Sequence, residues 1–443
     1  MLASSLSGGA ALAADFEKGL QAFNAGDYEN ALREWLPLAE DGDLNAMFNI
    51  ALIYDEGLGI AEDNEKALRW YLPSADAGDV AAQFNVASIY DFGDGVTEDN
   101  EQAIRWYTAA ALQADEQAQF NLGIMYGAGE GVAVDVQESL RWYRLSADQG
   151  HAAAQYNLGY VFDVGEGVPE DNEEALRWYR MSAAQHDSDA QYALALMFDE
   201  GDGPAEDNLI ATDWYRAAAE QQHMRAQFNL AIMYDLGEGV EENNATAIRW
   251  YSAAAEQGHA DAQLNLGLMF ENGQGTDADA AAALRWYRMA ADQGISQAQY
   301  AVALMLDNGT GVLEDNVAAI AWYTRAAEQG DADAQNNLAA MYDAGEGVEE
   351  DNARAFEWYL MAAEQGNAIA QNNLGAMYYA GEGAEPNKIE AYKWFYIAEK
   401  LGSEDGRNNR VASANNMLLA DILEAKEQAH KWLEEFEHSD SSL

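Results

Sequence analysis

Histidines and carboxylates are the residues of this chain that could do chemistry. His151, His223 and His259 stand at one register position of a 36-residue repeat, and whole repeats separate them. A metal site needs two or more converging ligands, so we expect surface histidines and no metal site. The acidic segment 343–351 could attract Ca²⁺, but it lacks the D-x-[DN]-x-[DN]-G spacing of a calcium loop.

No catalytic motif accompanies these residues. The chain contains no cysteine, and GxSxG, HExxH and SxxK arrangements are absent. Paired glycines such as Gly93 and Gly95 follow predicted helices rather than strands, so they indicate tight turns and not a phosphate loop. The carboxylate pairs lie in loops that nothing in the sequence buries, whereas an acid/base catalyst needs a shifted pKa. The sequence therefore predicts no catalytic residue and no cofactor.

The charge limits the classes of partner. Of 443 residues, 77 are acidic and 23 are basic, which gives a formal net charge of -54. Proteins bind nucleic acids and anionic membranes by neutralising phosphates with Lys and Arg, so we expect neither as a partner. The acidity fits two interpretations, a highly soluble surface or a docking surface for a cationic partner. No run of eighteen apolar residues exists, so we expect no membrane insertion.

The first fourteen residues fit two interpretations, a truncated signal peptide or a disordered leader. Residues 2–12 are small or apolar, and Ala11-Leu12-Ala13 is similar to a cleavage motif, but the first basic residue is Lys18. We favour the signal peptide, which predicts a periplasmic or secreted protein. Without a signal peptide the prediction becomes cytoplasmic.

A fixed repeat dominates the rest of the chain. Ten Trp-aromatic pairs recur every 36 residues: Trp70-Tyr71, Trp106-Tyr107, Trp142-Tyr143, Trp178-Tyr179, Trp214-Tyr215, Trp250-Tyr251, Trp286-Tyr287, Trp322-Tyr323, Trp358-Tyr359 and Trp394-Phe395. Such a period indicates stacked supersecondary units. In residues 79–114, helical spacing predicts a first helix from Ala81 to Tyr90 and a second through Ala111, with a glycine turn between them. Each unit is therefore a predicted αα-hairpin, and we expect the Trp column in the core.

The repeat resembles a known family. The unit from Ala152 to Gln185, with Ala154-Gln155-Tyr156-Asn157-Leu158-Gly159 followed by Gly165-Glu166-Gly167-Val168, is similar to the Sel-1-like repeat (SLR), a relative of the tetratricopeptide repeat. His186 departs from the Gly of most units. The resemblance implies an all-α, right-handed superhelical α-solenoid that acts as an adaptor in protein complexes. Bacterial members are frequently exported and act in signalling or envelope assembly.

The resemblance and the period together set the expected organisation. We expect about eleven 36-residue repeats over residues 15–402, capping helices over 403–437, and a frayed tail over 438–443. The amphipathic stripe of the last helix includes Leu418, Ala425, Ala429 and Trp432. It is expected to cover the last open apolar face, as a capping repeat does.

In tetratricopeptide-type hairpins the first helix lines the concave groove, which places positions such as 84, 88 and 91 toward it. Two sets of groove candidates follow, an aromatic column and an acidic column: Phe84, Phe120, Tyr156, Tyr192, Phe228, Tyr300; Asp91, Asp163, Asp199, Asp235. Together they suit an extended basic or apolar peptide. The alternative is that the aromatics pack against the adjoining helix and the acids are only solvated.

The sequence thus predicts a non-enzymatic scaffold that binds a partner protein or peptide along the groove. Two alternatives stay open. The resemblance offers a β-lactamase-like hydrolase, as described for cysteine-rich relatives, although this chain lacks their cysteines. The acidity is also compatible with a surface protein that binds cations. The sequence does not give the oligomeric state.

Overall fold

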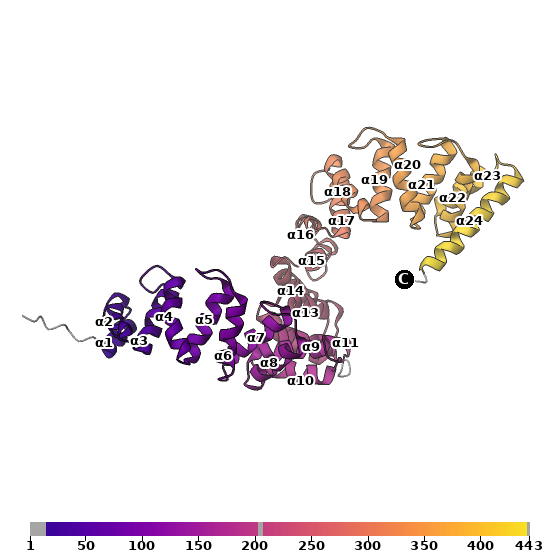
Figure 1. Ribbon diagram of the computed structural model, residues 1–443. Helices are drawn as coiled ribbons and strands as arrows, with labels where there is room; N and C mark the ends of the chain where they lie inside the picture. Colours follow the sequence, from indigo (N-terminus) through magenta and orange to yellow (C-terminus); the bar gives the residue numbers. More distant parts are fainter. Residues whose placement is uncertain (1–14, 203–206, 441–443) are drawn as a thin grey trace, which may run out of the picture. The chain divides into compact units, whose positions relative to one another are not determined.

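The computed structural model describes residues 15–202 and 207–440 (Figure 1). All the regular elements in these residues are helices, which run back and forth as hairpins. The all-α solenoid predicted from the sequence is confirmed. The predicted leader, residues 1–14, lies outside the described residues. None of the described helices is long and apolar enough to cross a membrane.

The chain divides into two compact units, residues 1–218 and 219–443. The first unit contains α1 (Phe16–Asn24), α2 (Tyr28–Glu40), α3 (Leu44–Asp55), α4 (Asn64–Asp76), α5 (Val80–Phe92), α6 (Asn100–Ala111), α7 (Glu116–Ala128), α8 (Val136–Asp148), α9 (Ala152–Val164), α10 (Asn172–Ala183), α11 (Ser188–Glu200) and most of α12 (Asn208–Glu220). The boundary falls inside a repeat whose 36-residue register continues, so no linker in the sequence marks it.

The second unit repeats the same hairpin. Its helices are α13 (Met224–Leu236), α14 (Asn244–Glu256), α15 (Ala260–Asn272), α16 (Ala280–Asp292), α17 (Ser296–Asp307), α18 (Asn316–Glu328), α19 (Ala332–Ala344), α20 (Asn352–Glu364), α21 (Ala368–Ala380), α22 (Lys388–Lys400), α23 (Glu404–Ala414) and α24 (Leu419–Asp440). We call α3, α5 and the following odd-numbered helices through α21 the first helices, and the even-numbered helices α4 through α22 the second helices.

The hairpin of α5 and α6 shows how local sequence sets the helix ends. The Asp79 carboxylate accepts a hydrogen bond from the backbone N–H of Ala82 at 2.8 Å and caps α5. Gly93 ends the helix in the left-handed region, with φ of 65°. The Asp99 carboxylate then caps α6 by accepting from the Gln102 N–H at 3.0 Å. Each of these caps depends on only a few consecutive residues.

The second glycine of the turn also lies close to the preceding hairpin at several positions. Gly95 has φ of 67°, and a Cβ atom there would lie 3.0 Å from the Cβ of Asn64 at the start of α4. At Gly131 the corresponding approach, to the backbone carbonyl carbon of Asn100, is 2.6 Å. The glycine pair is therefore turn chemistry, as predicted, and the second glycine also allows adjacent hairpins to approach closely.

Tyrosine and alanine side chains form the core of the array. The nine tyrosines of the Trp-aromatic pairs and Phe395 are all buried, as are the small residues from Ala67 to Ala391 at the register position three before each Trp. The Trp column is only partly in the core. Trp106, Trp142, Trp178, Trp286 and Trp394 are buried, whereas the other five are half-buried.

A buried glutamine joins each hairpin to the next, which the sequence analysis did not predict. Gln155 in α9 donates its amide to the Ala147 carbonyl of α8 at 3.0 Å and accepts from the Gln185 amide at 2.9 Å. The same amide pair recurs as Gln83–Gln113, Gln119–Gln149, Gln227–Gln257, Gln263–Gln293, Gln299–Gln329 and Gln335–Gln365. The ladder ends at Gln371, whose Oε1 is buried without a partner because Leu401 occupies the pairing position.

The two ends of the chain close the core differently. At the first, Trp35 is fully buried and donates its indole N–H to the Phe16 carbonyl at 3.1 Å. At the second, Ala425 and Ala429 of α24 are buried, and Trp432 meets Trp394 edge-on at 5.8 Å.

Two details of the predicted last helix need correction. Leu418 precedes α24 and is 72% exposed, so it does not belong to the buried stripe. The helix continues to Asp440, so residues 438–440 are helical and the boundary predicted at 437 is early. Residues 441–443 lie outside the described residues.

Candidate partner-binding face

The aromatic candidates lie on the first helices and pack against the second helix of their own hairpin. All six are half-buried. Their ring centroids lie 5.6–6.0 Å from the tyrosine of that hairpin: Phe84–Tyr107, Phe120–Tyr143, Tyr156–Tyr179, Tyr192–Tyr215, Phe228–Tyr251 and Tyr300–Tyr323. Replacing these aromatics would therefore disturb the core as well as the face, so they are poor probes of binding alone.

The acidic candidates are partners of the same tyrosines. The hydroxyl of Tyr107 donates to Asp91 at 3.1 Å, and that of Tyr179 donates to Asp163 at 3.0 Å. The pair recurs as Tyr71–Asp55, Tyr215–Asp199, Tyr251–Asp235, Tyr287–Glu271 and Tyr323–Asp307. These carboxylates are therefore not only solvated, because each accepts a hydrogen bond that joins the first and second helices of one hairpin.

An asparagine extends this pair to the following hairpin. The Asn265 amide donates to the Tyr251 hydroxyl at 3.3 Å, and the Asn337 amide donates to the Tyr323 hydroxyl at 3.2 Å. The same register position holds Asn121 and Asn157 in the first unit. The asparagine column was missed in the sequence analysis, although its 36-residue recurrence is visible there.

Partial burial shifts the titration of both members of the pair. Desolvation raises the pKa of Asp91 and of Asp163 above the ordinary value of 3.8, and nearby carboxylates add to this while the tyrosine hydrogen bond opposes it. Burial likewise raises the pKa of Tyr107 and Tyr179, and the adjacent carboxylate adds to the effect. Each tyrosine therefore keeps its proton and acts as the donor.

Replacing Asp163 with Asn is expected to raise the free energy of unfolding at pH 7 by less than about 1 kcal/mol. A carboxyl whose pKa is raised by folding contributes stability below its unfolded value of 3.8 and loses that contribution as the pH rises. Asparagine keeps an acceptor for the Tyr179 hydroxyl without a charge to desolvate. Urea denaturation at pH 7 and pH 4 measures the gain, which should shrink at pH 4. A loss of stability at pH 7 would contradict this account.

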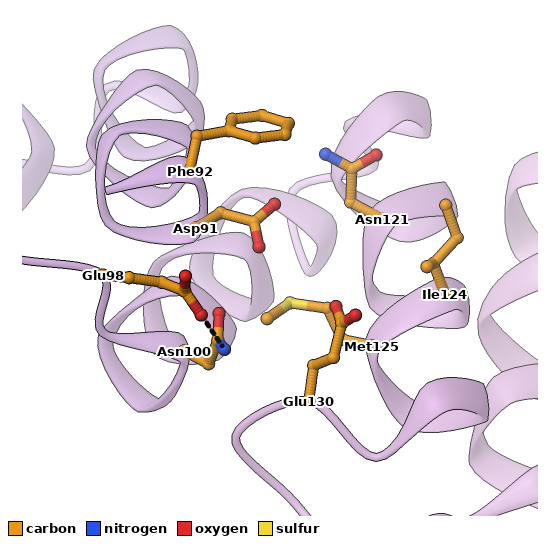
Figure 2. Close-up of a pocket in the computed structure, with 8 residues that line it drawn as sticks. All are labelled: Asp91, Phe92, Glu98, Asn100, Asn121, Ile124, Met125 and Glu130. Atoms are coloured by element: carbon orange, nitrogen blue, oxygen red, sulfur yellow. Dashed lines mark hydrogen bonds between the residues drawn. The ribbon is translucent and has the colours of Figure 1, made fainter. Parts of the chain in front are cut away.

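Two adjacent pockets lie between successive first helices of the first unit. The pocket between α5 and α7 encloses about 370 Å³ and is lined by Asp91, Phe92, Glu98, Asn100, Asn121, Ile124, Met125 and Glu130 (Figure 2). Glu98 accepts from the Asn100 amide at 2.8 Å. Ile124 on α7 is 37% exposed and Phe92 at the end of α5 is 68% exposed. This pocket thus combines carboxylates with exposed apolar side chains.

The second pocket lies between α7 and α9, one repeat further along the chain than the first. Its volume is about 300 Å³, and its lining includes Ile124, Gly127, Tyr143, Asn157, Tyr160 and Glu166. Gly127 occupies the register position of the acidic column, so Tyr143 has no carboxylate partner there. Burial raises the Tyr143 pKa, and the neighbouring Asn157 and Ser139 side chains oppose this shift. Tyr160 is 46% exposed at the pocket's edge.

Basic residues are segregated by helix. The first helices α3 to α21 contain a single Lys or Arg, Arg225, whereas the second helices α4 to α22 contain sixteen. The arginines cover the Trp column, as Arg141 lies 4.6 Å from the Trp142 ring centroid and Arg177 lies 4.5 Å from that of Trp178. These stacks hold the arginine side chains on the second helices. The negative charge of the carboxylates on the first helices is therefore not balanced by basic side chains on the same helices, and this face is acidic.

The three register-equivalent histidines cap helices. The Nδ1 atoms of His151, His223 and His259 accept from the backbone N–H of Ala154, Ala226 and Ala262 at 3.2, 3.1 and 3.3 Å. Their rings are half-buried, which differs from the predicted surface position. Within residues 15–202 and 207–440, no group of three or more His, Cys, Asp or Glu is placed to hold a metal ion.

Comparison with known proteins identifies the repeat. The Sel1 repeat model matches ten segments, 44–79, 80–115, 116–151, 152–187, 188–223, 225–259, 260–295, 296–331, 332–367 and 368–403. The chain belongs to the Sel1 repeat family. The hairpin of α1 and α2 precedes the first matched Sel1 repeat, although we predicted eleven units from residue 15. Proteins built from Sel1 repeats are generally protein-interaction scaffolds and typically lack catalytic activity.

Two solved Sel1-type structures are similar over most of their length. One is a protective antigen of uropathogenic Escherichia coli strains that displays an SLR fold, with 33% identity, coverage of 91% of this chain and 95% of that chain, and a TM-score of 0.67. The other is a Sel1 repeat protein from Oxalobacter formigenes, with 30% identity, coverage of 76% and 98%, and a TM-score of 0.59. No curated protein matched the chain.

The structure sorts the predicted site residues of this Sel1 repeat chain. The four acidic candidates all accept a hydrogen bond from a tyrosine, and Asp91 also lines a pocket. At position 88 of the register, the side chains of Ile124 and Tyr160 are exposed. The sequence analysis placed that position toward the groove but did not name its residues. Which of these side chains touch a partner stays a prediction.

Proposed function

We propose that this chain is a scaffold that holds an extended segment of a partner protein along its first helices. The observation that carries the proposal is the pair of neighbouring pockets beside the exposed side chains of Ile124 and Tyr160. Exposed apolar side chains next to fixed hydrogen-bonding groups are typical of peptide grooves. The Tyr–Asp pairs and the Gln ladder hold the helices that present them, so the face is organised before a partner arrives.

Neither alternative from the sequence analysis gains a supporting observation. A hydrolase would need a nucleophile beside a base. The pockets are lined by carboxylates, amides and the Ser139 hydroxyl, which donates to the Gly123 carbonyl at 2.6 Å. Binding of a specific cation would need converging ligands, which the described residues do not offer. Protein binding is therefore the function that the geometry supports best.

Replacing both Ile124 and Tyr160 with Ala is expected to weaken capture of a native partner at least about tenfold, because Ile124 lines both pockets and Tyr160 lines the second. The matched control replaces Leu145 and Met181 with Ala. These side chains are 39% and 41% exposed and lie on the second helices α8 and α10. Cross-linking with quantitative mass spectrometry of the captured protein measures the difference.

The control distinguishes partner binding on the first helices from partner binding on the second helices. Circular dichroism should show both double variants as helical as the unmodified chain. Equal capture by the Ile124/Tyr160 variant and the unmodified chain, or equal loss in the control variant, would contradict binding on the first helices.

A further inference from the structure

The occupant of the two pockets can be specified further, if the proposed function holds. We propose that the partner segment bound across α5, α7 and α9 presents a Lys or Arg side chain to each pocket and an apolar side chain to Ile124 between them. Ile124 lines both pockets, so one continuous segment can reach the two in sequence.

Charge complementarity argues for cationic side chains. Asp91, Glu98 and Glu130 line the first pocket and Glu166 lines the second. No Lys, Arg or His occurs in α5, α7 or α9, or in the turns 93–99, 129–135 and 165–171 that follow them. The arginines of this region lie on the second helices and are held by Trp rings and by carboxylates such as Glu138 and Glu174. No cationic side chain of these helices and turns therefore balances the carboxylates around the pockets. A partner can supply that positive charge.

The electrostatics of the first pocket support the same occupant. Desolvation raises the Asp91 pKa, and the charges of Glu130 and Glu98 add to it. A Lys or Arg placed among these groups would offset their mutual repulsion. An acidic partner segment would increase the repulsion, so the pocket discriminates against it.

The second pocket fits a long side chain with an apolar stem. Ile124, Val161 and the Tyr143 and Tyr160 rings give it apolar walls, and Asn157 and Glu166 add polar atoms. Lys and Arg bury their methylene stems against apolar surface and keep the charged end near acceptors, and an aromatic wall adds a cation–π contact. Residue 127 in its lining is Gly, and a Cβ atom there would lie 3.1 Å from Ser139 Oγ.

The probe is a fluorescein-labelled peptide in which two lysines flank a leucine, compared with the same peptide carrying glutamates in their place. Fluorescence anisotropy is expected to show binding of the lysine peptide and none of the glutamate peptide. Changing Glu130→Gln together with Glu166→Gln is expected to weaken binding about five- to tenfold, the effect of two partly exposed ion pairs.

The charge-matched control removes two acids from the second helices of the same region, Glu101→Gln with Glu173→Gln, which are exposed in α6 and α10. This variant should bind the lysine peptide as the unmodified chain does. Equal weakening in both double variants would show unspecific attraction by the net charge and would overturn the proposal.

A third variant tests the pocket at constant charge. Gly127→Leu fills the space with apolar atoms while favouring helix over Gly, so a loss of binding would not reflect loss of α7. We expect binding to weaken about tenfold or more because the pocket is closed. Unchanged binding would overturn the second pocket as a Lys or Arg site.

The two proposals fail separately. A native partner that depends on Ile124 and Tyr160 but not on Glu130 and Glu166 would overturn the cationic occupant and leave the scaffold function standing. Binding of the lysine peptide at the pockets, together with a native partner indifferent to Ile124 and Tyr160, would overturn the proposed function instead.

Discussion

Replacing Gln155 with Leu is expected to lower the free energy of unfolding of the hairpins around α9 by about 2 kcal/mol. Leucine has a similar volume but no amide. The Ala147 carbonyl would lose its donor at 3.0 Å and the Gln185 amide would lose its acceptor at 2.9 Å. The side chain of Gln155 is buried, so water cannot easily replace its bond to the Ala147 carbonyl. The Gln185 amide is exposed and keeps its bond to the Gly150 carbonyl at 2.8 Å. Urea denaturation and amide exchange of α9 measure the loss.

The end of the ladder supplies a matched control. Gln371 makes the equivalent bond to the Ala363 carbonyl at 3.0 Å, but its Oε1 has no partner because Leu401 replaces the pairing glutamine. Gln371→Leu therefore removes one hydrogen bond and also an unpaired acceptor, and we expect it to cost less than about 1 kcal/mol. Equal losses for the two variants would mean that the amide pair contributes little.

Changing His151, His223 and His259 together to Asn is expected to make the chain less sensitive to mild acid. Each ring caps a helix through an Nδ1 atom that accepts a backbone N–H. A protonated ring cannot accept this bond, and its charge would also face the positive end of the helix. Asn367 caps α21 in the same way without titrating, so asparagine is a cap that the array already uses.

The direction of the effect follows from the pKa shifts. Burial lowers the pKa of His151 and His259 below the ordinary value of 6.5, and Glu116 and Asp261 respectively oppose this. The unfolded chain therefore binds protons first as the pH falls, and stability present above pH 6.5 is lost below it. We expect a loss of about 1 kcal/mol for each capped helix.

Thermal melts of both proteins from pH 7 to pH 5 measure this loss. The carboxylates are the same in the two proteins, so the difference between their melting temperatures isolates the histidines. We expect the difference to grow in favour of the asparagine variant below pH 6.5. Parallel pH profiles would show that the histidine caps carry no acid sensitivity.

The sequence alone determined the hairpin, its register and its ends. The caps at Asp79 and Asp99 and the turn at Gly93 involve residues within a few positions of each other, so local physical chemistry decides them. The burial of every tyrosine in the Trp-aromatic pairs follows from the helical period, because one face of each second helix must be covered by its neighbours.

The candidate face was predicted only in outline. Its position on the first helices follows from the period and from the resemblance to the Sel-1-like repeat. The Tyr–Asp pairs join residues 16 apart and the Gln pairs join residues 30 apart. Such contacts depend on the depth and angle at which helices meet, which the sequence pattern does not state.

Only the tertiary structure decided which positions are open. In the sequence Gly127 is one substitution in the acidic column, whereas in the fold it lines a pocket together with Tyr143. Likewise Phe120 and Ile124 are two apolar residues one turn apart on α7, yet the first packs against Tyr143 and the second faces both pockets. The reason is geometric, since residues one turn apart lie on the same side of a helix and only the neighbouring helices fix where the line between core and surface falls on that side.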